Sequence, residues 1–451
     1  MLVRKRYYFW LLKAYIKRWK RTIFTSLVVG IVLFFASFTT FNFYIKPIFQ
    51  KQLTKIGYAG VYKIENIPDN ILKDVSFGLT QIEENGQIAS AAASSWEIKQ
   101  DGKVYLFHLK KGLYFHDGKE LTAYSIPLNF EDVKRGVVDK YTVSYTLKKP
   151  YSPFLVSVSR PILLPNLSGL GKYRIKKIEL NAGFVKSFVL QNKDNSQIRK
   201  NIYFYPSQDS LKTAFALGEI DQATGLTSLT LAPNYDFKAW KNVKIEKKTQ
   251  VGEMVALFYN TTHSSLSNKK FRQALNYALP EKVPFGLRAF SPFHPNNIYF
   301  STPPNYGIAD MEIAKQLLSG VDLDSKEIIE ISTTQEYEDV AKQVAQSWSR
   351  LGVKVEIKLV DGIPTAFEVF LHEIKLPQDP DQYTLWHSDQ INNDNITHFK
   401  NLRIDKLLED GRVTTETDKR MQIYADFQKY MLDEVPASFF YFPYSYTLVR
   451  K

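Results

Sequence analysis

The stretch that decides the fold lies at residues 95–123 and reads SWEIKQDGKVYLFHLKKGLYFHDGKELTA. Two segments with strand composition, 96–98 and 104–109, flank Gln100-Asp101-Gly102, a sequence typical of a hairpin turn. Lys111-Gly112 and Asp117-Gly118 indicate further turns. We therefore predict an antiparallel hairpin followed by tight loops in the first half of the chain.

The second half has a different pattern. Residues 328–332 and 353–360 have strand composition, and 335–351 between them has apolar residues at helical spacing, with Gly352 as a natural helix stop. A strand, a helix and a strand in succession indicate a sheet covered by helices. We expect another helix at about 418–433 and a proline-rich loop at 280–304.

Composition places the chain among ordinary globular proteins. Of its residues, 44% are hydrophobic and 23% are charged. Its length of 451 residues exceeds what one hydrophobic core usually supports, so we predict two or three lobes. There is no cysteine, which excludes disulfides, iron–sulfur sites, zinc fingers and thiol catalysis.

The net charge of +13 is concentrated at the N-terminus. Residues 1–22 contain no acid and eight cations, namely Arg4, Lys5, Arg6, Lys13, Lys17, Arg18, Lys20 and Arg21. The rest of the chain holds 51 basic and 46 acidic side chains, a balance too mild for a phosphate-binding surface. We therefore expect no nucleic-acid partner.

An uncharged stretch follows the basic segment. Residues 23–45 read IFTSLVVGIVLFFASFTTFNFYI, which as a helix of ~1.5 Å per residue spans roughly 35 Å, enough to cross a bilayer. The alternatives are a buried soluble helix and a cleaved signal peptide, whose apolar region is shorter and ends in a small-x-small site. We expect an uncleaved transmembrane helix followed by a tether at 46–58.

The positive-inside rule gives the direction of this helix. Residues 1–22 are expected on the cytoplasmic side, either along the inner headgroup layer or as a disordered basic tail. Residues 46–451 are expected on the extracytoplasmic face of the cell membrane, so that the lipid bilayer is itself a partner.

Catalytic motifs are missing from the sequence. It contains no H-E-x-x-H, no G-x-S-x-G and no P-loop, and Gly169-Leu170-Gly171-Lys172 has the wrong glycine spacing for a dinucleotide fingerprint. We interpret His116-Asp117 as a turn. Asp379 and Asp381 could form an acid/base pair, but a solvated loop or a ligand-binding role is the preferred interpretation. We expect no enzyme activity, no catalytic residue, no metal site and no cofactor.

Further segments follow 95–123 in a recognisable order: VDKYTV at 138–143, LKKPYSPFL at 147–155, GLGKY at 169–173, LGEID at 217–221, FYNT at 258–261, FRQALNYAL at 271–279, IDKLL at 404–408, DKR at 418–420 and Pro436. In this order the chain resembles the oligopeptide- and dipeptide-binding family of ABC-importer receptors, family 5 of the extracellular solute-binding proteins. The resemblance covers nearly all of residues 60–451.

The resemblance implies a bilobal, periplasmic-binding-protein-like α/β fold. The implied parts are a first lobe at 59–255 with an inserted subdomain at about 83–165, a second lobe at 256–430, and a C-terminal return to the first lobe at 431–451. The inserted subdomain is trimmed, because only 124–137 fills a gap that is usually longer.

The implied function is that of a substrate-binding protein that closes its lobes over a peptide or similar small solute. It delivers the solute to an ABC permease and its ATPase subunits. The alternative is a membrane-tethered sensor or adaptor that reuses the binding fold without transport.

The resemblance also places the ligand region of the second lobe near DPDQYTLWHS at 379–388. Asp379 and Asp381 offer charge to an ammonium group, Tyr383 and Trp386 offer flat apolar surface, and Asn260 lies at the expected lobe crossover. The alternative is that Tyr383 and Trp386 belong to the core and the acids cap a helix.

One departure concerns the ligand's amino terminus. Peptide-binding relatives often carry an aspartate three residues before an acidic-Pro pair, and matching that pair to Asp379-Pro380 places Leu376 there. Either Asp379 or Asp381 substitutes for this clamp, or the amino terminus of the ligand is not recognised.

Overall fold

The computed structural model describes residues 2–40, 52–233, 235–302, 309–321 and 328–451, with side chains from residue 7 onward in the first helix. This helix, α1 (Leu2–Thr40), has non-helical dihedral angles at Trp19 (φ −109°, ψ 16°), near the end of its basic part. Every side chain from Tyr7 to Thr40 is exposed. Within the described residues α1 alone is long and apolar enough to cross a membrane. Residues 41–45 of the expected span lie outside the described part.

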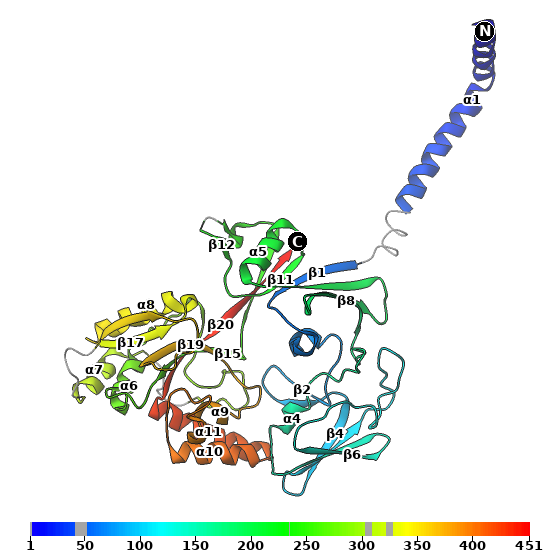
Figure 1. Cartoon of the computed structure of the whole chain (residues 1–451). Coiled ribbons are helices and arrows are strands. Elements are labelled where there is room, and N and C mark those ends of the chain that lie inside the picture. Colours follow the sequence, from blue (N-terminus) through cyan, green and yellow to red (C-terminus); the bar gives the residue numbers. More distant parts are fainter. Residues whose placement is uncertain (1, 41–51, 234, 303–308, 322–327) are drawn as a thin grey trace.

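One 12-stranded sheet runs through both lobes (Figure 1). Its longest strand, β20 (Ala437–Arg450), is rich in aromatic and β-branched residues, which favour strands. The first part of β20 pairs with β15 (Glu253–Tyr259) and β16 (Gly286–Arg288), and its last part pairs with β14 (Val243–Thr249) and β11 (Gln222–Leu226). The chain therefore crosses between lobes at residues 250–252 and again within β20.

The first lobe is built around β1 (Gln52–Ala59), which pairs in parallel with β10 (Ile198–Tyr205) and β11. The expected tether at 46–58 is therefore wrong for 52–58, because these residues form an inner strand. The partners of β1 lie more than a hundred residues away, so the local pattern did not reveal the pairing. The remaining elements of this lobe are η2 (Ile64–Asn66), α3 (Asp69–Leu72), β8 (Tyr173–Asn181), β9 (Phe184–Asn192), α5 (Gln208–Leu217), β12 (Thr230–Ala232), β13 (Tyr235–Asp236) and η3 (Phe237–Ala239).

The inserted subdomain contains the hairpin predicted from 95–123. It forms a four-stranded antiparallel sheet in the order β4 (Ala93–Lys99), β5 (Val104–Leu109), β7 (Thr142–Leu147) and β6 (Val133–Asp139). The hairpin β2 (Thr80–Ile82) and β3 (Ile88–Ser90) and the short α4 (Phe154–Ser157) complete it.

The glycines of the G-x-G segment at 169–171 serve packing. A Cβ atom at Gly169 would lie 2.2 Å from the carbonyl oxygen of Val75, and one at Gly171 would lie 2.5 Å from that of Asp74. The Gly171 N–H donates to the Val75 carbonyl at 2.8 Å. These glycines therefore let two backbone segments of the first lobe approach closely.

The second lobe confirms the predicted β–α–β unit. β17 (Ile328–Thr333) and β18 (Lys354–Leu359) are parallel and joined by η4 (Gln335–Tyr337) and α8 (Glu338–Arg350), while β19 (Val369–Lys375) pairs with β15 and β17. The second lobe has two hydrophobic cores, of which one contains Trp348 and the other contains Trp386. The other helices are α6 (Lys269–Tyr277), α7 (Met311–Ser319), α9 (Tyr383–Trp386), η5 (Ser388–Gln390), α10 (Leu402–Val413) and α11 (Thr417–Glu434).

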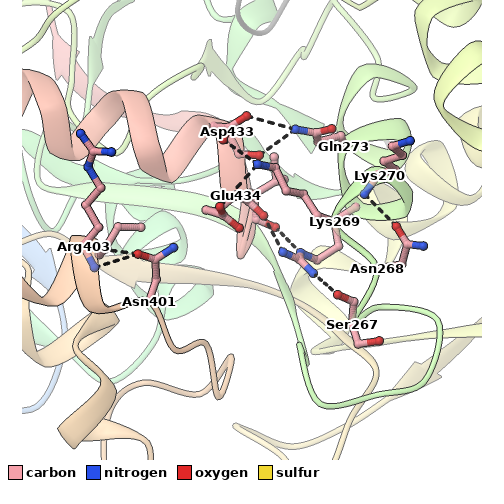
Figure 2. Close-up of polar contacts among 12 residues, drawn as sticks. Ser267, Asn268, Lys269, Lys270, Gln273, Asn401, Arg403, Asp433 and Glu434 are labelled. Carbon is pink, nitrogen blue, oxygen red and sulfur yellow. Dashed lines mark hydrogen bonds and ion pairs between the residues drawn. The ribbon is translucent and has the colours of Figure 1, made fainter.

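The end of α11 is held by α6 (Figure 2). Lys269 contacts Asp433 at 2.6 Å and Glu434 at 3.4 Å, and the Gln273 amide donates to the Asp433 carbonyl at 2.7 Å. Arg272 donates to the backbone carbonyls of Glu434 (2.6 Å) and Val435 (2.9 Å). These contacts satisfy carbonyls that a helix end leaves unpaired. They therefore fix the helix that leads into β20.

Glu373 gives the second lobe a pH-dependent stability. Burial raises the pKa of Glu373 to about 7, and the charge of Glu253 acts in the same direction. A carboxyl whose pKa is higher in the folded state stabilises the fold at low pH and progressively less between about pH 4.5 and 7. Glu373→Gln should therefore raise stability at pH 8 and flatten this pH dependence, measured by urea unfolding. The exposed Glu356→Gln is the control, and an equal effect of both variants would contradict the prediction.

Candidate ligand-binding site

A cleft of about 510 Å³ lies between the lobes. Its second-lobe wall is the loop from Pro377 to Asp381, which follows β19. The opposite wall belongs to the first lobe and its inserted subdomain, namely Asp69, Phe130, Tyr151, Pro153, Val156, Ser157, Ser159 and Arg160. The volume is within the usual range for small-molecule sites.

Asp379 lies at this cleft in a buried ion pair with Arg420 of α11. The Nη1 and Nη2 atoms of Arg420 donate to the two carboxylate oxygens at 2.9 and 2.5 Å, so the pair is bidentate. Arg420 also donates through Nε to the Gly411 carbonyl at 2.8 Å. Burial by itself lowers the pKa of Arg420, but the hydrogen bonds and charge of Asp379 raise it above its ordinary value. Arg420 is thus held in its charged form.

Asp381 is paired in a similar way with α10. Its Oδ2 atom accepts from Arg412 Nε at 2.8 Å, and its Oδ1 atom accepts the Tyr383 backbone N–H at 3.1 Å. The Arg412 guanidinium lies 3.9 Å from the centre of the Tyr383 ring, and that ring stacks on His387 at 4.0 Å. The carboxylate therefore anchors an arginine and the first turn of α9.

The other two predicted site residues have structural contacts. Trp386 is 1% exposed, packs in the second-lobe core and donates to the Gln382 side chain at 2.8 Å. The Asn260 amide donates to the Phe367 carbonyl at 3.0 Å, and its oxygen accepts from Thr262. The contacts of these residues and of the two acids favour the alternative of core and capping roles. Their roles toward a ligand stay predictions.

Sequence reasoning missed the two arginines. Arg420 is in the DKR segment and Arg412 lies in the last turn of α10, but neither was matched to an acid. The available signal was chemical, because a buried carboxylate requires a cation or several donors. Within the described residues, no group of three histidines, aspartates or glutamates is placed to hold a metal ion.

A second cleft of about 350 Å³ shares Asp379 with the first. It is lined by Trp96 and Ile98 of β4 on the subdomain side and by Arg420 and Met421 of α11 on the other side. The Asp379–Arg420 pair therefore stands at the boundary between two hollows, each bordered by the inserted subdomain and the second lobe.

The inserted subdomain touches the second lobe directly. The Ser152 N–H donates to the Arg412 carbonyl at 2.6 Å, and the Ile298 N–H donates to the Asn85 carbonyl at 2.9 Å. In Figure 1, α10 and α11 reach the inserted subdomain at the lower side of the molecule, while the crossing strands β15 and β20 lie above them. The lobes are thus connected both at the crossover and at the subdomain.

Comparison with known proteins adds to this geometry. The family of bacterial extracellular solute-binding proteins, family 5 (middle region), matches residues 87–136 and 128–390. The chain belongs to this family. The match spans both lobes and the loop that carries Asp379, and it confirms the resemblance noted in the sequence.

Individual relatives of this family 5 protein are distant. The oligopeptide-binding protein AppA of Bacillus subtilis is 23% identical, covering 86% of this chain and 84% of the relative. Heme-binding protein A of Haemophilus influenzae is 24% identical, covering 81% and 80%. Among solved structures, NikZ of Campylobacter jejuni in complex with Ni(L-His) has 22% identity and a TM-score of 0.68, covering 89% and 94%. These similarities confirm the bilobal α/β fold, while the names of these relatives state three different ligands.

Proposed function

We propose that this family 5 protein is a membrane-anchored, extracytoplasmic substrate-binding protein of an ABC importer that captures short peptides and delivers them to a permease. The observation that carries the proposal is the 510 Å³ cleft between two lobes joined through β15 and β20. Lobes connected by a few strands can close on a ligand by a hinge. The oligopeptide-binding relative supports peptides as the solute class.

Calorimetry of the full chain in nanodiscs with a pool of unblocked apolar tripeptides tests this function. We expect saturable binding, and we expect transport of the bound peptides when the cognate permease and ATPase subunits are added. Peptide binding without any transport would favour the sensor or adaptor. Tight binding of a sugar or a metal complex, with no peptide binding, would overturn the peptide class.

The membrane anchor is part of the proposal. It is supported by the exposed, apolar part of α1 from Ile23 onward and by the eight cations before it. We expect the protein to stay with membranes after a high-salt wash and to keep its own N-terminus. Deletion of residues 1–45 should release it completely. N-terminal sequencing that begins beyond about residue 43 would show cleavage and contradict the anchor.

A further inference from the structure

Four charged side chains line the 510 Å³ cleft, and two of them already have a charged partner. Asp379 is paired with Arg420 and Asp381 with Arg412, as described above. An ammonium group of a ligand would have to compete with a bidentate guanidinium at Asp379. The second-lobe wall of the cleft is therefore nearly neutral in charge.

The other two charged side chains are Asp69 of α3 and Arg160, shortly after α4. Both residues are exposed. Among the described residues, neither side chain has an ion pair within 4.0 Å, and the only charge that acts on the Asp69 carboxyl is that of Arg160. Partial desolvation of the carboxyl group at the cleft wall raises the pKa of Asp69, whereas the charge of Arg160 acts in the opposite direction. The partly desolvated carboxylate thus lacks a close cation.

We propose that Asp69 and Arg160 recognise the charges of the ligand, with Asp69 binding an ammonium group and Arg160 binding a carboxylate of a short zwitterionic peptide. This inference rests on the proposed function and adds the charge class of the ligand and the two residues that select it. One charge of each sign on the same wall matches a ligand with one charge of each sign. The planar guanidinium of arginine suits a carboxylate because it can donate two parallel hydrogen bonds.

The remaining surface of that wall suits the body of a peptide. The Phe130 and Tyr151 rings provide apolar area with tolerance for different side chains. The hydroxyls of Ser157 and Ser159 donate to the Pro153 and Val156 carbonyls of their own turn, which leaves their oxygens as acceptors for peptide N–H groups. Charge selection by Asp69 and Arg160 is thus combined with loose selection of side chains.

Calorimetry of the full chain in nanodiscs with three peptide pools tests the inference. The pools are unblocked apolar tripeptides, the same peptides N-acetylated, and the same peptides C-amidated. For the wild type we expect each blocked pool to bind about tenfold to a hundredfold more weakly, the usual loss when a charge-assisted contact is removed. Arg160→Gln should bind the unblocked and amidated pools equally. Asp69→Asn should bind the unblocked and acetylated pools equally.

The controls are Arg350→Gln and Asp361→Asn, two exposed residues outside the cleft, which should behave as the wild type. If the unblocked pool binds and both blocked pools bind equally well, the inference is overturned and the proposed function stands. If discrimination survives in both cleft variants, other residues recognise the ligand charges and the inference is equally overturned. If no pool binds, the peptide function itself fails.

Discussion

Arg420→Met should lower the free energy of unfolding by about 3–5 kcal/mol, because it leaves Asp379 as a buried carboxylate without its cation. The side chains of Arg420 and Asp379 are only 5% and 9% exposed, so water compensates little for the lost partner. Asp379→Leu should destabilise by a similar amount, since it leaves the guanidinium unpaired. Urea unfolding followed by tryptophan fluorescence measures both effects.

The double variant Asp379→Leu with Arg420→Met separates the ion pair from simple loss of packing. We expect it to be more stable than either single variant, because no unpaired charge remains. Lys419→Met is the matched control, because Lys419 is the exposed neighbour of Arg420 on α11. This variant should lower the free energy of unfolding by less than about 1 kcal/mol. If the losses in free energy of unfolding of the two single variants add up in the double variant, Asp379 and Arg420 are not coupled.

A disulfide between the inserted subdomain and the second lobe should strongly slow ligand exchange. Asn85→Cys with Ile298→Cys joins two residues whose backbones are already hydrogen-bonded at 2.9 Å. The lobes are connected at the crossover strands and again at this contact, so a hinge cannot open the cleft while the contact is locked. We expect the oxidised variant to exchange bound peptide at least tenfold more slowly than the reduced variant, measured with a fluorescent peptide.

The absence of native cysteines makes this experiment specific, since the two introduced thiols are the only ones in the chain. Reduction should restore exchange, and each single-cysteine variant should exchange like the wild type under oxidising conditions. Unchanged exchange in the verified disulfide form would mean that the cleft opens without breaking the subdomain contact.

The location of the acids changes how the substitution at Leu376 is understood. Leu376 is packed beside the second-lobe core, and its N–H donates to the Gly252 carbonyl at 2.8 Å, next to the crossover between lobes. The neighbouring acids Asp379 and Asp381 already form ion pairs, with Arg420 and Arg412 respectively. On our proposal, recognition of ligand charge therefore shifts from the second lobe to the first.

Local patterns were sufficient wherever the interaction partners are close in sequence. The β4–β5 hairpin, the β17–α8–β18 unit and helix α11 were predicted within a few residues, because turn chemistry and apolar spacing are encoded in short windows. Composition alone was enough to identify the apolar helix α1. The order of short motifs along the chain indicated the family, and with it the bilobal fold.

Only the tertiary structure decided the partners of residues that are distant in sequence. The strand β1 was missed because its partners lie at 198–205 and 222–224. The predicted ligand acids were found paired with Arg412 and Arg420, which lie 31 and 41 positions away along the chain. A sequence shows that a carboxylate is present, but its electrostatic environment depends on which cation the fold brings within hydrogen-bonding distance. For this reason the sequence alone determined the architecture and the family, and the fold decided which charges remain available in the cleft.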